Sequence, residues 1–202
     1  MPVCNKISDT MMILKKIWSA ITLALTYPAI DPSTRRTIKD DFEAFCRFKE
    51  VKTSIHTFVS LFARYPEFRS VVFSRVKNRY RLLPSIFLRG QHACFLRSDR
   101  IGSGLVLLHG FSTIINAEHI GKRAIIFQQV TVGYSKGGEP LIGDDCTICC
   151  GAVVVGKIRI GNNVTIGAGA VVTHDIPDNA VVAGNPARII GANDNRHSSF
   201  ML

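Results

Sequence analysis

Apolar residues return at every sixth position over much of the second half of the chain. Between residues 142 and 177 the aliphatic residues at this spacing are Ile142, Ile148, Val154, Ile160, Ile166 and Val172. An α-helix requires apolar spacings of three and four, and a half-buried strand requires strict alternation, so neither explains so long a run. A period of six is typical of a parallel β-helix built from hexapeptides, with three hexapeptides in each coil. We therefore expect a mainly β fold, a solenoid.

Glycine follows the aliphatic residue in several of these repeats, at Gly143, Gly161 and Gly167. A glycine suits a corner where the backbone needs a positive φ or where there is no room for a Cβ atom. The sequence alone leaves both explanations open.

The same register extends backwards, with two breaks. Repeats begin at Ile101, Leu107, Ile120, Ile126 and Val132. We expect one extra residue between Leu107 and Ile114, and an excursion with the sequence GYSKGGEPL before Ile142. After Val172 we expect the coil to end at Pro177 and the chain to fold back through residues 184–186. Because breaks in a solenoid form loops on one face, the binding site is expected there.

The first part of the chain has helical periodicity instead. Spacings of three and four predict a helix over residues 10–26, and start signals at residues 31–34 predict a second helix. A third is expected from about Thr53, interrupted at Pro66 and continued to Pro84. We expect the aromatic side chains to form a core between helices; a face for a partner chain or a membrane surface is the alternative.

This pattern divides the chain into three parts. An α-helical region is expected over residues 1–92, the β-helix over residues 93–190, and a polar tail over residues 191–202. A solenoid plus a small second unit is compatible with a length of 202 residues.

Positive charge is concentrated before the solenoid. The net charge is +10, and residues 61–100 carry nine Lys and Arg against two acids, whereas residues 101–190 carry six of each. A basic stretch can contact nucleic acid, an anionic membrane surface or acidic glycans, although a solvated helix face is the simpler explanation. No aromatic and basic motif supports nucleic acid. The apolar run over residues 17–25 is shorter than the roughly 20 residues that span a bilayer, so we expect a cytoplasmic protein, soluble or peripheral at the inner membrane surface.

The six cysteines include a C-x-x-C-C motif formed by Cys146, Cys149 and Cys150. The register places Cys146 at a core position and the other two elsewhere, and no second Cys or His pair lies at zinc spacing. We therefore expect free thiols and no metal site, in agreement with a reducing compartment.

Two stretches resemble the hexapeptide-repeat acyltransferases with a left-handed β-helix, and specifically their serine acetyltransferase-like branch. They are LVLLHGFSTIINAEHIGKRAIIFQQVTVGY and IGNNVTIGAGAVVTHDIPDNAVVAGNPARII. That branch also includes capsule and exopolysaccharide O-acetyltransferases. The resemblance covers about residues 90–190 and implies acetyl-CoA as co-substrate. It also implies a homotrimer with sites between neighbouring subunits, with a trimer doubled through the helical region as a further alternative.

Transfer of an acetyl group from a thioester to a hydroxyl needs a base, a donor for the oxyanion and a slot for the pantetheine arm. His109 lies in the one seven-residue repeat, and histidine suits proton transfer near neutral pH; the resemblance makes it the catalytic base. A backbone N–H near Tyr134 is the expected oxyanion donor, and Arg188 is expected at the nucleotide phosphates. By resemblance, the slot is lined by Gly133, Tyr134, Cys150, Gly151, Ala168 and Gly169. Each glycine has a simpler explanation as a solenoid corner.

Departures from the serine acetyltransferases concern the acceptor. Cys94 and Leu108 stand where those enzymes have aspartates, and residues 139–141 (Glu-Pro-Leu) stand where an Arg–His pair holds the substrate carboxylate. A zwitterionic amino acid needs an anion for its amine and a cation for its carboxylate, and Glu139 would repel the carboxylate. We therefore predict a sugar hydroxyl of a bacterial surface polysaccharide or its precursor as acceptor, with serine as the alternative. The candidate acceptor-binding residues are Asn116, Gln128, Gln129 and Glu139. A hexapeptide scaffold without activity is the non-enzymatic alternative.

Overall fold

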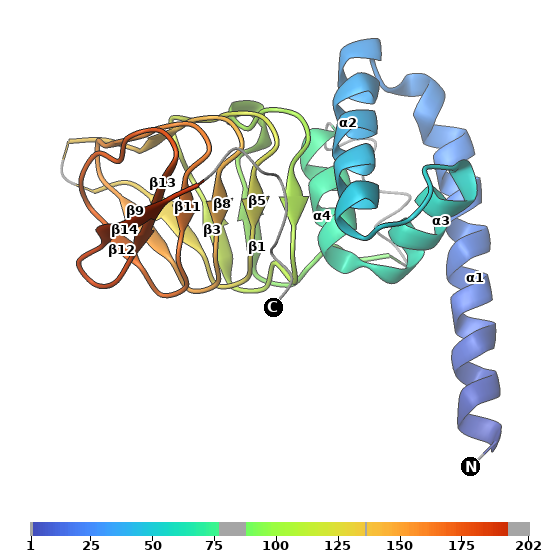
Figure 1. Cartoon of the computed structure of the whole chain (residues 1–202). Coiled ribbons are helices and arrows are strands. Elements are labelled where there is room, and N and C mark those ends of the chain that lie inside the picture. The colour runs from blue at the N-terminus through green and yellow to red at the C-terminus, as the bar shows by residue number, and fades with distance from the viewer. Residues whose placement is uncertain (1, 77–87, 136, 194–202) are drawn as a thin grey trace.

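The structure, a computed structural model, describes residues 2–76, 88–135 and 137–193. Over these residues four α-helices precede a parallel β-helix, and Figure 1 shows the helices gathered at one end of the elongated solenoid. The helices are α1 (Pro2–Thr26), α2 (Pro32–Phe48), α3 (Ile55–Arg64) and α4 (Pro66–Arg75), with a 3-10 turn η1 (Tyr27–Ala29) after α1. The parallel β-helix predicted from the period of six is confirmed.

Local signals set the helix boundaries. The Asp31 carboxylate caps α2 by accepting a hydrogen bond from the Thr34 N–H at 2.9 Å, and hydrogen bonds from Ser33 and Thr34 hold the pKa of Asp31 well below its ordinary range. The Ser54 hydroxyl caps α3 in the same way. Pro66 is the first residue of α4, where its missing N–H costs nothing. The predicted end of this helical stretch at Pro84 lies outside the described residues.

Aromatic side chains form the core between α2, α3 and α4, as predicted. Phe45, Phe62 and Phe68 are fully buried, and the rings of Phe45 and Phe68 lie 5.2 Å apart between centroids. The first helix, α1, begins earlier than predicted and packs on α3. No described helix is both long and apolar enough to cross a membrane.

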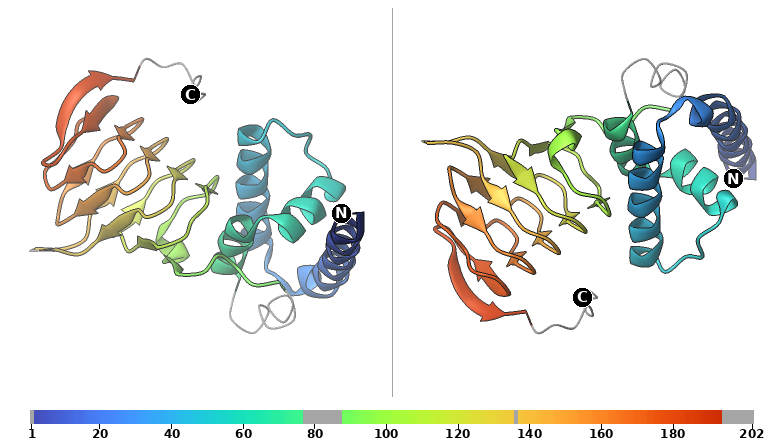
Figure 2. Two further views of the ribbon diagram at one scale, coloured as in Figure 1. Left: turned by 90° about the horizontal axis from the view of Figure 1, so that it is seen from below. Right: turned by 90° about the horizontal axis from the view of Figure 1, so that it is seen from above.

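Three sheets form the walls of the β-helix, and each coil passes once through all three (Figure 2). Sheet A consists of β1 (Cys94–Leu96), β3 (Thr113–Ile115), β6 (Thr131–Gly133), β9 (Val153–Val155) and β12 (Val171–Val172). Sheet B consists of β4 (His119–Ile120), β7 (Leu141–Ile142) and β10 (Arg159–Ile160). Sheet C consists of β2 (Val106–Leu107), β5 (Ile125–Ile126), β8 (Thr147–Ile148), β11 (Thr165–Ile166), β13 (Ala180–Ala183) and β14 (Arg188–Ala192). Every pair is parallel except β13 with β14. A 3-10 turn, η2 (Ser98–Arg100), precedes the first full coil.

The repeating aliphatic residues point into a narrow core, where all six are almost completely buried. Cys146 is buried among them, as the register predicted. The glycine after the aliphatic residue is required by space: a Cβ atom on Gly143 would lie 2.6 Å from Asn162 Oδ1 and 2.7 Å from Gly161 O, while its φ is not positive. Successive coils therefore pack too closely at this corner for any side chain.

Two details of the register differ from the prediction. Ile115, not Ile114, is the inward residue: Ile115 is buried and pairs with Val132, whereas Ile114 is 46% exposed. Leu107 and Ile115 are successive inward residues eight positions apart, so the turn between them holds two extra residues. Both His109 and Ser112 adopt a positive φ within it. At the other end the coil does not stop at Pro177. Strand β13 continues sheet C, and the chain folds back only after it.

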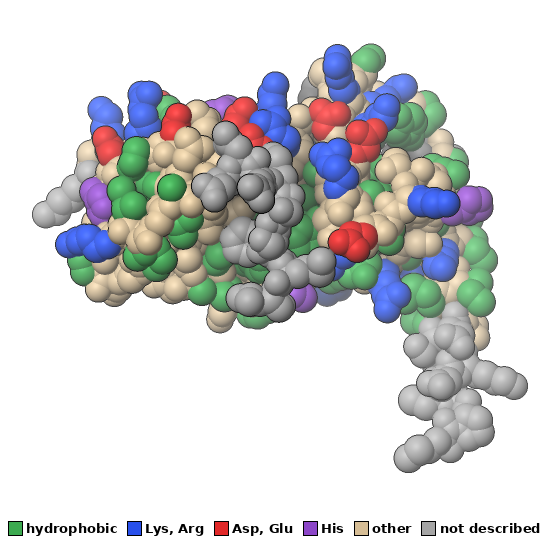
Figure 3. Space-filling model, viewed as in Figure 1, with side chains coloured by type: hydrophobic (Ala, Val, Ile, Leu, Met, Phe, Trp, Pro, Cys, Tyr) green, Lys and Arg blue, Asp and Glu red, His purple; other side chains and the backbone are tan. Residues whose placement is uncertain are grey.

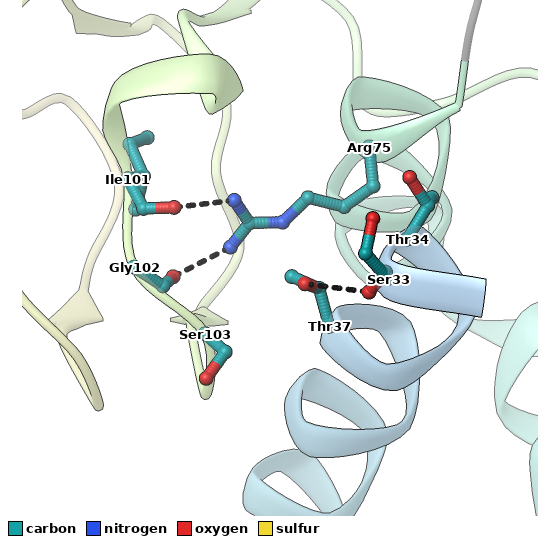
Figure 4. Close-up of a pocket in the computed structure, with 7 residues that line it drawn as sticks. All are labelled: Ser33, Thr34, Thr37, Arg75, Ile101, Gly102 and Ser103. Carbon is teal, nitrogen blue, oxygen red and sulfur yellow. Dashed lines mark hydrogen bonds between the residues drawn. The ribbon is translucent and has the colours of Figure 1, made fainter. Parts of the chain in front are cut away.

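A buried ion pair fastens the helices to the first coil. Arg75 of α4 donates to the carbonyls of Ile101 and Gly102 at 2.6 and 2.7 Å, as Figure 4 shows. The Asp41 carboxylate of α2 accepts from Arg75 Nε at 3.0 Å and from the N–H groups of Gly104 and Leu105 at 2.8 Å each. Burial raises the pKa of Asp41, and the attraction of Arg75 only partly offsets this. The helical unit thus fixes the backbone that leads into β2.

Candidate functional site

His109 is the second residue after β2, at the corner where the chain passes from sheet C to sheet A. Its φ is 60°, and the carbonyls of Leu108 and His109 accept from the N–H groups of Gly110 and Phe111 at 2.7 Å each. This tight turn leaves His109 exposed although the two residues before it are buried. The predicted base therefore faces outward and not into the hydrophobic interior.

The corners below His109 form a continuous ridge, here called the C–A ridge (residues 109–112, 128–129, 150–151 and 168–169). Backbone hydrogen bonds join its levels: Gln129 N to Phe111 O, Gly151 N to Gln128 O, and Gly169 N to Cys150 O. Seven of the predicted site residues share this ridge: His109, Gln128, Gln129, Cys150, Gly151, Ala168 and Gly169. Arg188 opens β14 beside Ala183 and is exposed.

The other predicted site residues lie at the opposite edge of sheet A, where the chain turns toward sheet B. Asn116, Gly133, Tyr134 and Glu139 are all at this edge. Glu139 accepts hydrogen bonds from Asn116 Nδ2 at 2.9 Å, from Arg97 Nη1 at 3.4 Å and from Arg100 Nη1. Arg97 also donates to Asn116 Oδ1 at 2.7 Å. We call Arg97, Arg100, Asn116 and Glu139 the Arg–Glu cluster.

Arg97 and Arg100 were not predicted as site residues. They follow β1, and the corner that contains Asn116 lies between their corner and the corner that contains the excursion. Extending the register one repeat before Ile101 would have placed them beside Glu139. Their positions correct the electrostatic argument about the acceptor, because Glu139 does not stand alone: two guanidinium groups and one carboxylate give the cluster an excess of one positive charge.

Gly133 is open on its outer side. A Cβ atom there would meet no described atom within 4 Å, and its φ is not positive, so neither packing nor backbone conformation within the chain requires glycine. A strand glycine of this kind typically marks a place where a ligand or another backbone approaches closely. Tyr134 beside it is 68% exposed.

Three residues bear on whether His109 has an acidic or hydrogen-bonding partner: Leu108 and Cys94, where the sequence resemblance leads one to expect aspartates, and Gln128 of the neighbouring coil. Leu108 is buried in the core of the helical unit. Burial raises the pKa of Cys94 to about 11, so its thiol stays protonated near neutral pH. Gln128 follows β5, the strand that pairs with β2, and its Oε1 is buried without a hydrogen-bond partner in the described chain. No group of three or more His, Cys, Asp or Glu residues suited to a metal occurs within the described ranges.

The C–A ridge and the Arg–Glu cluster of one chain are separated by sheet A. Strand β3 spans three residues between them, which corresponds to roughly 10 Å. The outer face of this sheet carries exposed apolar side chains, with Phe95 at 65% and Ile114 at 46% exposure. One chain alone therefore does not bring His109 to the cluster.

Comparisons with known proteins identify relatives of the solenoid. The family model described as bacterial transferase hexapeptide (six repeats) matches residues 139–174. Serine acetyltransferase of Synechococcus elongatus is 33% identical over 143 residues, which cover 62% of this chain and 57% of that protein. Serine acetyltransferase of Bacillus subtilis is 41% identical over 98 residues, which cover 46% of this chain and 45% of that protein. The chain thus spans about half the length of these relatives.

Solved structures of the same kind share the fold. The crystal structure of Neisseria gonorrhoeae serine acetyltransferase superimposes with a TM-score of 0.64 at 24% identity, covering 88% of this chain and 70% of that one. The soybean serine acetyltransferase apoenzyme gives a TM-score of 0.63 at 29% identity, covering 79% and 70%. The relatives named here are serine acetyltransferases, and the polysaccharide acceptor predicted above gains no support from them.

Proposed function

Because the chain is a hexapeptide-repeat protein of the serine acetyltransferase type, we propose that it transfers the acetyl group of acetyl-CoA to the hydroxyl of serine. The observation that carries the choice of serine is the Arg–Glu cluster. A free amino acid presents an ammonium and a carboxylate, and the cluster offers a carboxylate for the first and guanidinium groups for the second. This pairing removes the reason for preferring a sugar.

In the proposed reaction His109 accepts the proton of the serine hydroxyl as its oxygen attacks the thioester carbonyl. The developing oxyanion is stabilised by a backbone N–H near Tyr134. When the carbon–sulfur bond breaks, the imidazolium returns the proton to the departing CoA thiolate. The small residues of the C–A ridge leave room for the pantetheine arm, and Arg188 would meet its phosphates.

We propose further that the site is completed in a homotrimer, where His109 of one copy faces the Arg–Glu cluster of the next. Two observations support this arrangement. The two groups lie at opposite edges of sheet A in one chain, and the apolar side chains between them are exposed there. A neighbouring copy on this face would cover Phe95 and Ile114 and approach Gly133.

The acceptor is tested with labelled acetyl-CoA and three parallel arms: serine, cell-surface oligosaccharides, and buffer alone. Label in O-acetylserine is expected, and label in the oligosaccharides alone would refute the proposed acceptor. His109→Ala should lower transfer by about 10²-fold to 10⁴-fold, because general base catalysis contributes that much. CoA binding should persist in this variant, and undiminished turnover would contradict the role of His109.

The shared site is tested by complementation. His109→Ala and Arg100→Ala each remove one half of the site, so each variant alone should be inactive. In mixed trimers at equal amounts, about a quarter of the interfaces combine an intact His109 with an intact cluster, so about a quarter of the wild-type activity should return. If co-purification through different tags on the two variants shows mixed trimers and no activity returns, the site lies within one chain.

A further inference from the structure

Helix α1 exposes a stripe of large apolar side chains. Ile13 and Leu14 are each 56% exposed, Ile17 is 52% exposed and Ile21 is 46% exposed. At 100° per residue these four positions fall within an arc of about 100°, so they form one continuous face of the helix. We call these four residues the α1 stripe.

The stripe faces away from the rest of the chain. Ser19, on the opposite side of the helix, is fully buried, and Trp18 packs against the aromatic core of the helical unit. Contacts between α1 and α3 fix this orientation. Figure 1 shows α1 at the outer end of the molecule, farthest from the solenoid, so the described chain leaves the stripe uncovered.

Basic residues accompany the stripe. Helix α1 contains three lysines and one acid, and Lys16 is exposed directly before Ile17. Residues 1–100 carry eighteen Lys and Arg against eight Asp and Glu, so the whole net charge of +10 belongs to this part of the chain. In Figure 3 basic side chains are prominent on the visible face of the helical unit, with acidic side chains between them.

We propose that the α1 stripe docks on an anionic membrane surface, with the helix lying in the plane of the interface. Such helices carry isoleucine and leucine on one face and basic side chains beside it, and here Lys16 borders the stripe: the apolar side chains enter the acyl boundary, and the ammonium group meets lipid phosphates. A second copy of the chain fits less well. Two-fold pairing centred on Ile17 would bring the two Lys16 side chains together, and the stripe contains no carboxylate to neutralise them.

The test uses the full-length chain and sedimentation with lipid vesicles. Binding is expected to vesicles of phosphatidylcholine mixed with phosphatidylglycerol, to weaken as salt is raised, and to be at least about tenfold weaker for phosphatidylcholine alone. The variant Ile13→Ser/Ile17→Ser/Ile21→Ser should lose binding by more than about tenfold, because it removes three of the four apolar side chains that would enter the acyl boundary.

The matched control is Ile189→Ser/Ile190→Ser, which removes two isoleucines of β14 that are at least as exposed as those of the stripe and should leave vesicle binding unchanged. Circular dichroism checks that both variants remain folded. Equal binding of the α1 variant and the wild type would overturn the proposal. Failure of the wild-type chain to bind vesicles would also overturn the proposal. If the α1 variant then showed a changed oligomeric mass, the stripe would be assigned to contact with a second copy. None of these outcomes depends on acetyl transfer.

Discussion

Two glycines of the solenoid, Gly143 and Gly133, are expected to be glycine for different reasons. Gly143 is required by packing within the chain, whereas Gly133 leaves space for another molecule. At Gly143 a Cβ atom would lie 2.6–2.8 Å from three atoms of the next coil, two of them backbone atoms of Gly161. At Gly133 a Cβ atom would meet no described atom within 4 Å. Alanine at the two positions should therefore change stability in opposite directions.

The expected magnitudes follow from these distances. Ordinary contacts of a Cβ atom are 3.4–4 Å, so Gly143→Ala must push the coils apart, and overpacking of this kind costs about 1–3 kcal/mol. Gly133→Ala introduces no clash and restricts the unfolded chain, so the free energy of unfolding should rise by about 0.4–1 kcal/mol. The same substitution should lower acetyl transfer at least about tenfold, because the methyl group occupies the space that the thioester arm or the neighbouring copy requires.

Chemical denaturation measures the first effect, and kcat/KM for acetyl-CoA measures the second. Light scattering of Gly133→Ala distinguishes a lost trimer from a blocked slot in an intact one. Full activity of Gly133→Ala in an intact trimer would show that nothing approaches this glycine. Wild-type stability of Gly143→Ala would refute the steric explanation of the repeat's glycines.

Further predictions concern buried groups. Asp41→Ala should lower the free energy of unfolding by about 2–6 kcal/mol in denaturant titrations, because the buried N–H groups of Gly104 and Leu105 lose their acceptor. Burial raises the pKa of Asp41 above its ordinary value of 3.8, so between these two pKa values the folded chain holds a proton that the unfolded chain has released. The contribution of Asp41 to stability therefore falls as pH rises from 3.8 through the raised pKa. The variant should lack this decline. Burial also raises the pKa of Cys94 and Cys146 to about 11, so peptide mapping should find both almost unlabelled by iodoacetamide at pH 8 in the folded chain and labelled after unfolding.

The repeat was predictable because the core residues of a solenoid recur at a fixed spacing in the sequence. Each sixth residue must enter the same narrow interior, so Ile142 and its equivalents could be assigned without knowledge of any other element. The helical core was predictable for a similar reason, since its phenylalanines recur at helical spacing. Proline and capping residues then marked where α2, α3 and α4 begin.

The breaks in the repeat were not predictable to the residue. Thr113, Ile114 and Ile115 are all acceptable strand residues, so only the backbone pairing of Ile115 with Val132 decides which one points inward. The Arg–Glu cluster was missed for a related reason. Its members come from corners of three successive coils, and sequence distance alone gave no signal that Arg97 and Glu139 are neighbours.

The position of His109 is determined by packing on both sides of the strand that precedes it. Leu107 is buried in the core of the solenoid, and the next residue, Leu108, is buried in the core of the helical unit. Asp41 meanwhile holds the N–H groups of residues 104 and 105. A histidine that lacks a carboxylate beside it can still be held in place if its backbone cannot move, and two hydrophobic cores that meet at β2 provide that restraint. The helical unit therefore helps to hold the backbone of the proposed base His109 in place, through the segment before β2. Disrupting the Asp41–Arg75 pair should impair acetyl transfer as well as stability.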